Sequence, residues 1–156
     1  MPGVILCPGQ GDPIGVPSVP AINWDQSMAT GVDAVDDWNK KVIVWLNTLL
    51  AAMLRGKGQM EIHDLLDQLG AFTAAYFAHE EECVVRHKCP AAKKNAAAHD
   101  NASMLLDSLN AEFERNGATA HLTVRIETVL MRVLTGHMKQ IDSGLYPCVQ
   151  AFGKTV

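Results

Sequence analysis

Residues 60–87 read MEIHDLLDQLGAFTAAYFAHEEECVVRH and show the longest helical pattern of the chain. Its apolar residues recur every three or four positions, which is the period of an α-helix that buries one face. Tyr76 and Glu80 fall near the centre of the same stripe, and His79 falls near its edge. Pro90 forces a break soon afterwards. The stretch therefore predicts a long amphipathic helix whose buried face turns from apolar to polar. The apolar part of the stripe, with one threonine, comprises Ile62, Leu65, Leu66, Leu69, Phe72 and Thr73.

Three further segments have the same helical period, over residues 33–54, 91–115 and 119–143. Each is closed by a short stretch that contains glycine or proline, namely RGKG, RNGA and SGLYP. No part of the chain alternates with the period of a β-strand for long. Four amphipathic helices with short connections predict an all-α fold, an up-down-up-down four-helix bundle.

The chain ahead of these helices differs in composition. Residues 1–23 carry five of the seven prolines, which predicts an extended, non-helical N-terminal arm. With 156 residues, of which 48% are hydrophobic, the chain is long enough for one good core and too short for two comfortable domains. We therefore expect an arm over residues 1–23 and one helical bundle over residues 24–150.

Charge and hydropathy exclude several classes of partner. The formal net charge is −4, and no cluster of Lys or Arg is larger than the pair Lys93 and Lys94, so we expect no nucleic-acid partner. No apolar run approaches the ~20 residues that span a bilayer. The opening MPGVILCPGQG has neither a charged n-region nor an h-region of useful length. A cytoplasmic protein with no membrane partner is the expectation.

The cysteines Cys7, Cys83, Cys89 and Cys148 form no CxxC pair and no zinc-ribbon spacing. In a reducing compartment we expect them to be single, buried or half-buried thiols. Metal ligation by Cys83 is a minor alternative.

Each of the four helical stripes carries polar residues where apolar ones are expected. A buried carboxylate such as Glu80 costs several kcal/mol unless something neutralises it. A bound cation is one such partner, because bundle cores build ligand sites from side chains on facing helices. Hydrogen-bonded core residues without a metal are the other interpretation. The inward polar residues are Asn39, Tyr76, Glu80, Asn95, His99 and His137.

Four blocks of this sequence resemble the bacteriohemerythrins, the prokaryotic relatives of invertebrate oxygen carriers. INWDQSMATGVDAVDDWNKKVIVWLNTLL resembles their opening, with its Trp-Asp-x-Ser and Gly-Val pattern, and LLDQLGAFTAAYFAHEEECVV is similar to their second-helix block, His-Phe-x-x-Glu-Glu. CPAAKKNAAAHDN resembles the Tyr-Pro-x4-His-x3-His block, and LTGHMKQIDSGLY the closing His-Ile-x3-Asp block. The resemblance covers about residues 22–148.

The resemblance implies a non-haem di-iron centre with two bridging carboxylates and five terminal histidines. Carried over by position, Glu80 and Asp142 are the bridging carboxylates, and His99 and His137 are retained histidines. The three remaining histidine positions hold Asn39, Tyr76 and Asn95. In the family the iron with two histidines keeps the open position for oxygen, and it is this side that loses both of them, to Asn39 and Tyr76. We therefore expect hemerythrin-type oxygen carriage to be weak or absent.

Asp142 enters through the resemblance alone. It lies five residues after His137, which an ideal helix places about 140° away, so its use as a ligand requires a local distortion such as a π-bulge. His79 points some 60° away from the ligand position, by the same helical geometry of about 100° per residue. We expect His87 to lie behind the ligands or at the surface, and His63 and His121 to face solvent. Glu81 and Glu82 are also expected to face solvent.

Three hypotheses follow for the function. The first is a binding protein with a single iron, held by Glu80, His99, His137 and Asp142, with Tyr76 as a fifth ligand. The second is a rewired di-iron centre that binds or senses dioxygen. The third is a metal-free bundle that serves as an interaction module for an unknown protein partner. The sequence has no nucleophile and base pair, phosphate loop or Rossmann fingerprint, so we do not expect an enzyme unless the metal supplies the chemistry.

Overall fold

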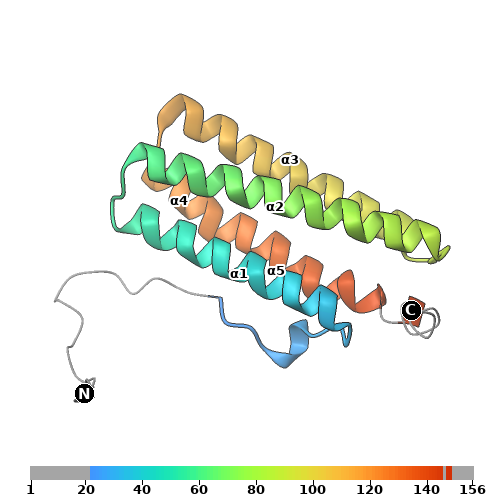
Figure 1. Cartoon of the computed structure of the whole chain (residues 1–156). Helices are drawn as coiled ribbons and strands as arrows, with labels where there is room; N and C mark the ends of the chain where they lie inside the picture. Colours follow the sequence, from blue (N-terminus) through green and yellow to red (C-terminus); the bar gives the residue numbers. More distant parts are fainter. Residues whose placement is uncertain (1–21, 146, 149–156) are drawn as a thin grey trace, which may run out of the picture.

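The computed structural model describes residues 22–145 and 147–148, and these form a bundle of four helical rods (Figure 1). Consecutive rods run in opposite directions, which confirms the predicted all-α bundle. The rods are α1 (Asp33–Leu54), α2 (Gln59–Arg86), α3 (Ala92–Asn116) and a fourth made of α4 (Ala120–Arg125), the π-helical turn η2 (Ile126–Leu130) and α5 (Met131–Gln140). Short 3-10 helices precede and follow the bundle, η1 (Gln26–Met28) and η3 (Asp142–Leu145).

Local signals set the ends of the rods. At the end of α3, Gly117 has a φ of 72°, a conformation that glycine adopts at low cost. A Cβ atom there would lie 2.9 Å from the side chain of Gln59, which accepts a hydrogen bond from Ala118 N at 3.2 Å. The fourth rod then starts at Thr119, whose hydroxyl caps it by accepting from Leu122 N at 3.1 Å. These contacts hold the α3–α4 turn against the start of α2.

The core has an apolar half and a polar half. The apolar half lies toward the α1–α2 and α3–α4 turns, and its side chains are almost fully buried; each contributes about 1.5–3 kcal/mol of stabilisation relative to an exposed position. The polar half lies toward the opposite end of the bundle, where α2 ends and α3 begins. The apolar half includes Leu46, Leu49, Ile62, Leu66, Leu109, Leu122 and Ile126.

The predicted N-terminal arm lies almost entirely outside the described residues. The part that is described is tied to α1, because Ile22 N donates to Asn47 Oδ1 at 2.9 Å and Asn47 Nδ2 donates to Ile22 O at 2.8 Å. Further on, Asp36 Oδ1 accepts from Thr30 N at 2.7 Å and so fixes the entry into α1. The boundaries of the arm and of the bundle domain stay predictions.

One expectation about the cysteines is wrong. Cys89 and Cys148, 59 residues apart in the sequence, form a disulfide with their Cα atoms 5.8 Å apart. This bond joins the α2–α3 turn to the segment that follows η3. Cys83 is a free, half-buried thiol as expected, and Cys7 lies outside the described residues. Among the helices described, none is long and apolar enough to cross a membrane.

Candidate metal centre

The structure brings the inward polar residues together in one cluster. α1 supplies Asn39, α2 supplies Tyr76 and Glu80, and α3 supplies Asn95 and His99. The fourth rod adds His137 from α5 and Asp142 from the start of η3. All seven are buried, with exposed fractions of 6% or less.

Glu80, His99 and His137 form the centre of this cluster. Glu80 Oε2 lies 2.9 Å from His99 Nε2 and 3.9 Å from His137 Nε2. Potential ligand atoms of the three residues all lie within 4.8 Å of one another. The ring of Phe77 stacks on that of His99 at a centroid distance of 3.8 Å, which fixes the plane of the imidazole. Two imidazoles and one carboxylate therefore converge in a water-poor interior.

Glu81 orients His99 from outside the cluster. His99 Nδ1 lies 2.7 Å from Glu81 Oε1, so its N–H can donate to that carboxylate while Nε2 faces Glu80. A histidine that ligates a metal commonly donates its other ring N–H in this way. The side chain of Glu81 is 42% exposed, as expected of a glutamate that faces solvent. Its contact with His99 was not predicted, because Glu81 lies about 100° around the helix from Glu80, outside the apolar stripe. Glu82 is exposed, as expected, and pairs with Arg86.

Asp142 reaches the cluster because the helix ends before it. α5 stops at Gln140, Ile141 has φ −104° and ψ −58°, and η3 then begins at Asp142. Asp142 Oδ1 consequently lies 2.8 Å from His137 Nε2. The sequence predicted that a distortion was needed, and the structure places it at a helix end and not at a π-bulge. The π-helical turn lies upstream, at η2.

His137 Nε2 and Asp142 Oδ1 lie close enough for an ion pair when His137 is protonated, but their geometry is not that of a hydrogen bond. Both ring nitrogens of His137 and the Oδ1 atom of Asp142 are buried and have no hydrogen-bond partner among the described residues. The side-chain oxygen and nitrogen of Asn95 are in the same situation. An unsatisfied buried polar group costs about 1–3 kcal/mol, more if it is charged. A cation between the imidazole and carboxylate groups would satisfy atoms that this set leaves unpaired.

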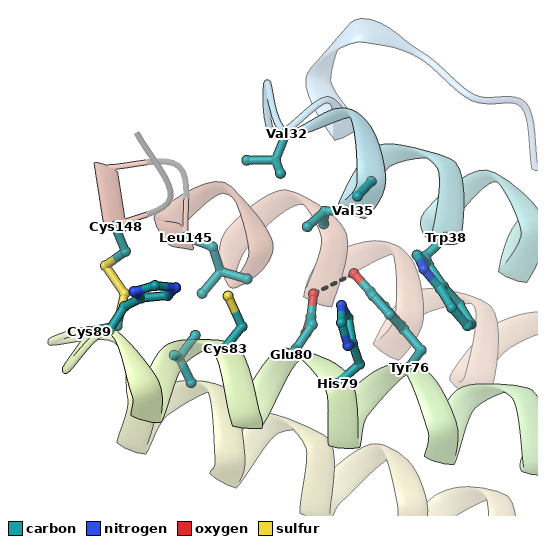
Figure 2. Close-up of a pocket in the computed structure, with 13 residues that line it drawn as sticks. Val32, Val35, Trp38, Tyr76, His79, Glu80, Cys83, Cys89, Leu145 and Cys148 are labelled. Atoms are coloured by element: carbon teal, nitrogen blue, oxygen red, sulfur yellow. Dashed lines mark hydrogen bonds between the residues drawn. A yellow bond between two sulfur atoms is a disulfide. The ribbon is translucent and has the colours of Figure 1, made fainter. Parts of the chain in front are cut away.

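On the other side of the two carboxylates, the outer oxygens of Glu80 and Asp142 accept hydrogen bonds from Tyr76 and Asn39. The hydroxyl of Tyr76 donates to Glu80 Oε1 (Figure 2) and lies 3.4 Å from Asp142 Oδ2. Asn39 Nδ2 donates to the same Asp142 Oδ2 at 2.8 Å. Trp38 stacks on the ring of Tyr76 at 5.4 Å and an interplanar angle of 9°. Glu80 and Asp142 thus each present one oxygen to the histidines and one to the phenol and amide.

Burial and charge set the protonation of the cluster. Burial alone raises the pKa of Glu80, but its contacts with His137, His99 and Tyr76 outweigh this and hold it at about 2. Burial lowers the pKa of His137, whereas Asp142 and Glu80 together raise it to about 9. The pKa of Asp142 is raised, first by burial and then by the charge of Glu80. Burial and the two carboxylates raise the pKa of Tyr76, so it is a neutral phenol at pH 7.

The other histidines lie outside the cluster. His79 is exposed and His87 is half-buried, and both line a cavity beside the cluster. His63 and His121 lie at the surface, with side-chain exposures of 45% and 75%, as the sequence predicted. His121 Nδ1 lies 2.7 Å from Glu112 Oε1.

Comparisons with known proteins identify the family of this chain. Residues 30–149 match the Hemerythrin HHE cation binding domain. This chain belongs to the hemerythrin family. Two relatives named bacteriohemerythrin are similar to it. That of Stenotrophomonas maltophilia (strain R551-3) is 25% identical over 129 residues, which cover 82% of this chain and 81% of the relative. That of Pseudomonas paraeruginosa (strain DSM 24068 / PA7) is 21% identical over 127 residues, 81% and 80% of the two chains. The recognised resemblance is thereby confirmed.

Proposed function

We propose that this hemerythrin-family chain is a binding protein for a single non-haem iron. The ligands we assign are His99, His137, Glu80 and Asp142. Imidazole and carboxylate groups together suit iron. The observation that carries the proposal is the pair His137 Nε2 and Asp142 Oδ1, two buried ligand-type atoms 2.8 Å apart without a hydrogen bond between them. When bound, the iron would supply a redox-active cation at the centre of the bundle.

The phenol and amide side argues against a second iron. Asn39 and Tyr76 hold the outer oxygens of Asp142 and Glu80 with their own hydrogens, and an amide oxygen is a weaker ligand than imidazole. Reversible oxygen binding in the family uses the side that is changed here, so we propose that it is weak or lost. Asn95, with both side-chain polar atoms unpaired, is positioned to add an amide oxygen on the histidine side or to hold a water.

Tyr76 is assigned here as a hydrogen-bond donor to Glu80, and its role as a fifth ligand stays a prediction. A phenolate on ferric iron would give a broad visible absorption band. Loss of such a band in Tyr76→Phe would establish direct ligation. A wild-type spectrum without the band would leave Tyr76 as a hydrogen-bond donor only.

Metal content per chain tests the proposal directly. The protein is produced with added iron, its iron is quantified, and a visible spectrum is taken before and after exposure to air. About one iron per chain supports a single-metal protein. About two would favour the rewired di-iron alternative with dioxygen as ligand, and near zero would favour a metal-free bundle that binds a protein partner.

A cytoplasmic location and the lack of an enzymatic activity also remain proposals. The Cys89–Cys148 disulfide weighs against the cytoplasm, because disulfides persist mainly in oxidising compartments. Alkylation of the intact chain immediately on cell lysis, followed by mass measurement, decides the point. A reduced pair supports the cytoplasmic proposal, and an oxidised pair contradicts it.

A further inference from the structure

A cavity of ≈190 Å³ lies beside the metal centre, between the start of α1, the last turns of α2 and the segment around η3 (Figure 2). Most of its walls are apolar. Tyr76 and Glu80 are its two buried polar residues, with exposed fractions of 2% and 3%. His79 is exposed and Cys83 is half-buried. The apolar walls are formed by Val32, Val35, Trp38, Val84, Leu145 and the Cys89–Cys148 disulfide.

The size of the cavity fits a small ring. An engineered apolar protein cavity of about 150 Å³ stays dry and binds benzene, and the present cavity is larger. A buried water needs two to four polar partners, which the apolar part of the walls cannot offer. One face of the cavity is aromatic, because Trp38 lies next to Tyr76. A ring-sized apolar molecule would therefore replace poorly held water and contact an aromatic wall.

The polar end of the cavity selects the ligand further. Tyr76 Oη has given its hydrogen to Glu80, so it can only accept, and the carboxylate of Glu80 is also an acceptor. Beside Tyr76 and Glu80 a ligand must therefore bring a hydrogen-bond donor, and an anion there would be repelled by Glu80, whereas His79 and His87 line other parts of the wall. A cation would lose its hydration among apolar walls at high cost. An uncharged hydroxyl meets all three conditions.

We propose that this cavity binds a small uncharged molecule with a ring-sized apolar body and one hydroxyl donor, that is, a phenol-type ligand. The ring lies among Val35, Trp38 and Leu145, and the hydroxyl donates to Tyr76 Oη. The proposal goes beyond iron binding and does not rest on it, because the cavity is bounded by side chains that are present with or without the metal.

A titration of the full-length protein with phenol, toluene and benzoate tests the proposal. Amide chemical shifts are followed by NMR, and the iron content of each sample is measured separately. We expect saturable phenol binding with shifts at the cavity walls, and phenol to bind about 3- to 10-fold more tightly than toluene through one net hydrogen bond. Benzoate should not saturate over the same range. Absence of saturable phenol binding, or equal affinities for phenol and toluene, overturns the proposal.

Two matched variants of α2 locate the site. Cys83→Phe places a ring in the cavity wall and should weaken phenol binding at least 10-fold. Val85→Phe adds the same ring to the same helix at a position that is 68% exposed and outside the cavity walls, and it should leave binding unchanged. Thermal unfolding of both variants checks that they fold, and the smaller Cys83→Leu replaces the first if it does not. Equal binding by wild type and a folded cavity-filled variant would contradict the assignment.

Removing the hydroxyl of Tyr76 tests the polar end. In Tyr76→Phe the ring and its stacking with Trp38 are kept, so toluene should bind as in the wild type. Phenol should lose part or all of its advantage over toluene. An unchanged phenol preference would exclude Tyr76 as the hydrogen-bond partner and, with it, the proposed orientation.

Discussion

Glu80 and Asp142 divide the polar core into two sides, and the buried carboxylates are paired in a different way on each side. On the histidine side, which comprises His99, His137 and the oxygens Glu80 Oε2 and Asp142 Oδ1, the groups converge and several atoms stay unpaired. On the phenol–amide side, which comprises Tyr76, Asn39 and the oxygens Glu80 Oε1 and Asp142 Oδ2, donors and acceptors match. On the histidine side a protonated His137 or a bound cation supplies positive charge, whereas on the phenol–amide side neutral O–H and N–H groups supply hydrogen bonds.

The contrast shows what Asn39 and Tyr76 contribute to this core. Two buried carboxylates need positive charge or donors on each side, since neither can reach water. A phenol O–H and an amide N–H2 supply donors without charge, so the phenol–amide side is stable with no metal. The histidine side supplies ligands whose pairing with the carboxylates is incomplete. This incomplete pairing supports the proposal of a single metal on the histidine side.

The largest expected effect is the loss of iron from the histidine side. His99→Ala removes a ligand and the group that connects Glu80 to Glu81, so we expect iron per chain to fall from about one to near zero. Iron is quantified after identical loading and desalting. The matched control is His79→Ala, an exposed histidine on α2 outside the cluster, which should keep its iron. Equal loss of iron in both variants, or retention of iron in His99→Ala, would contradict the assignment of the iron to the histidine side.

The converse change should make the two sides alike. The double variant Asn39→His and Tyr76→His removes the donors of the phenol–amide side and restores ligands there, and we expect iron per chain to rise from about one to about two. The control places two histidines at exposed positions of the same helices, Val44→His and Val85→His, and should stay near one. A double variant that still holds one iron would show that Asn39 and Tyr76 are not what limits the metal content.

The next effect concerns the disulfide that closes the polar end of the bundle. The Cys89–Cys148 bond constrains a loop of 59 residues in the unfolded chain, so Cys148→Ser should lower the free energy of unfolding by about 2–4 kcal/mol. Denaturant unfolding of the metal-free protein measures this. Cys83→Ser changes the free thiol only and should have a much smaller effect. If the two serine variants are equally stable, the disulfide does not hold this end together.

The helices and six of the seven cluster residues could be predicted from the sequence because they depend on periodicity. The stripe over residues 60–87 placed Tyr76 and Glu80 inside, and the structure has α2 from Gln59 to Arg86. His99 and His137 followed from the same reasoning on the other rods. A helical period of 3.6 residues is a local property, so local sequence contains it.

The remaining features depend on relations that are not local. Asp142 reaches the cluster only because α5 ends at Gln140. Residue 141 is an isoleucine, so no glycine or proline at that position predicts the end of the helix. Cys89 and Cys148 are joined by the packing of η3 on the α2–α3 turn, 59 residues apart and without a motif. The contact between Glu81 and His99 was not predicted, because Glu81 lies one residue after Glu80 and so leaves the apolar stripe and faces α3.

The smallest expected effect is a pH dependence whose sign changes with the metal. In the metal-free protein the raised pKa of His137, about 9, contributes stability that is full below about 6.5 and is lost as the pH rises toward 9. The lowered pKa of Glu80, about 2, contributes stability that is present above about 4.5 and is lost as the pH falls toward 2. The raised pKa of Asp142 has the opposite effect to the lowered pKa of Glu80, so it reduces the loss of stability at acid pH.

We therefore expect the free energy of unfolding of metal-free protein to be greatest between about pH 4.5 and 6.5 and to fall above that by at most ~1.4 kcal/mol per pH unit. Iron affinity should instead increase with pH over the same range, because His137 must lose its proton to act as a ligand. Denaturant unfolding and competition with a chelator at matched pH values measure the two trends. Parallel trends would mean that His137 is no ligand, and His137→Gln should abolish the alkaline loss of stability in the metal-free protein.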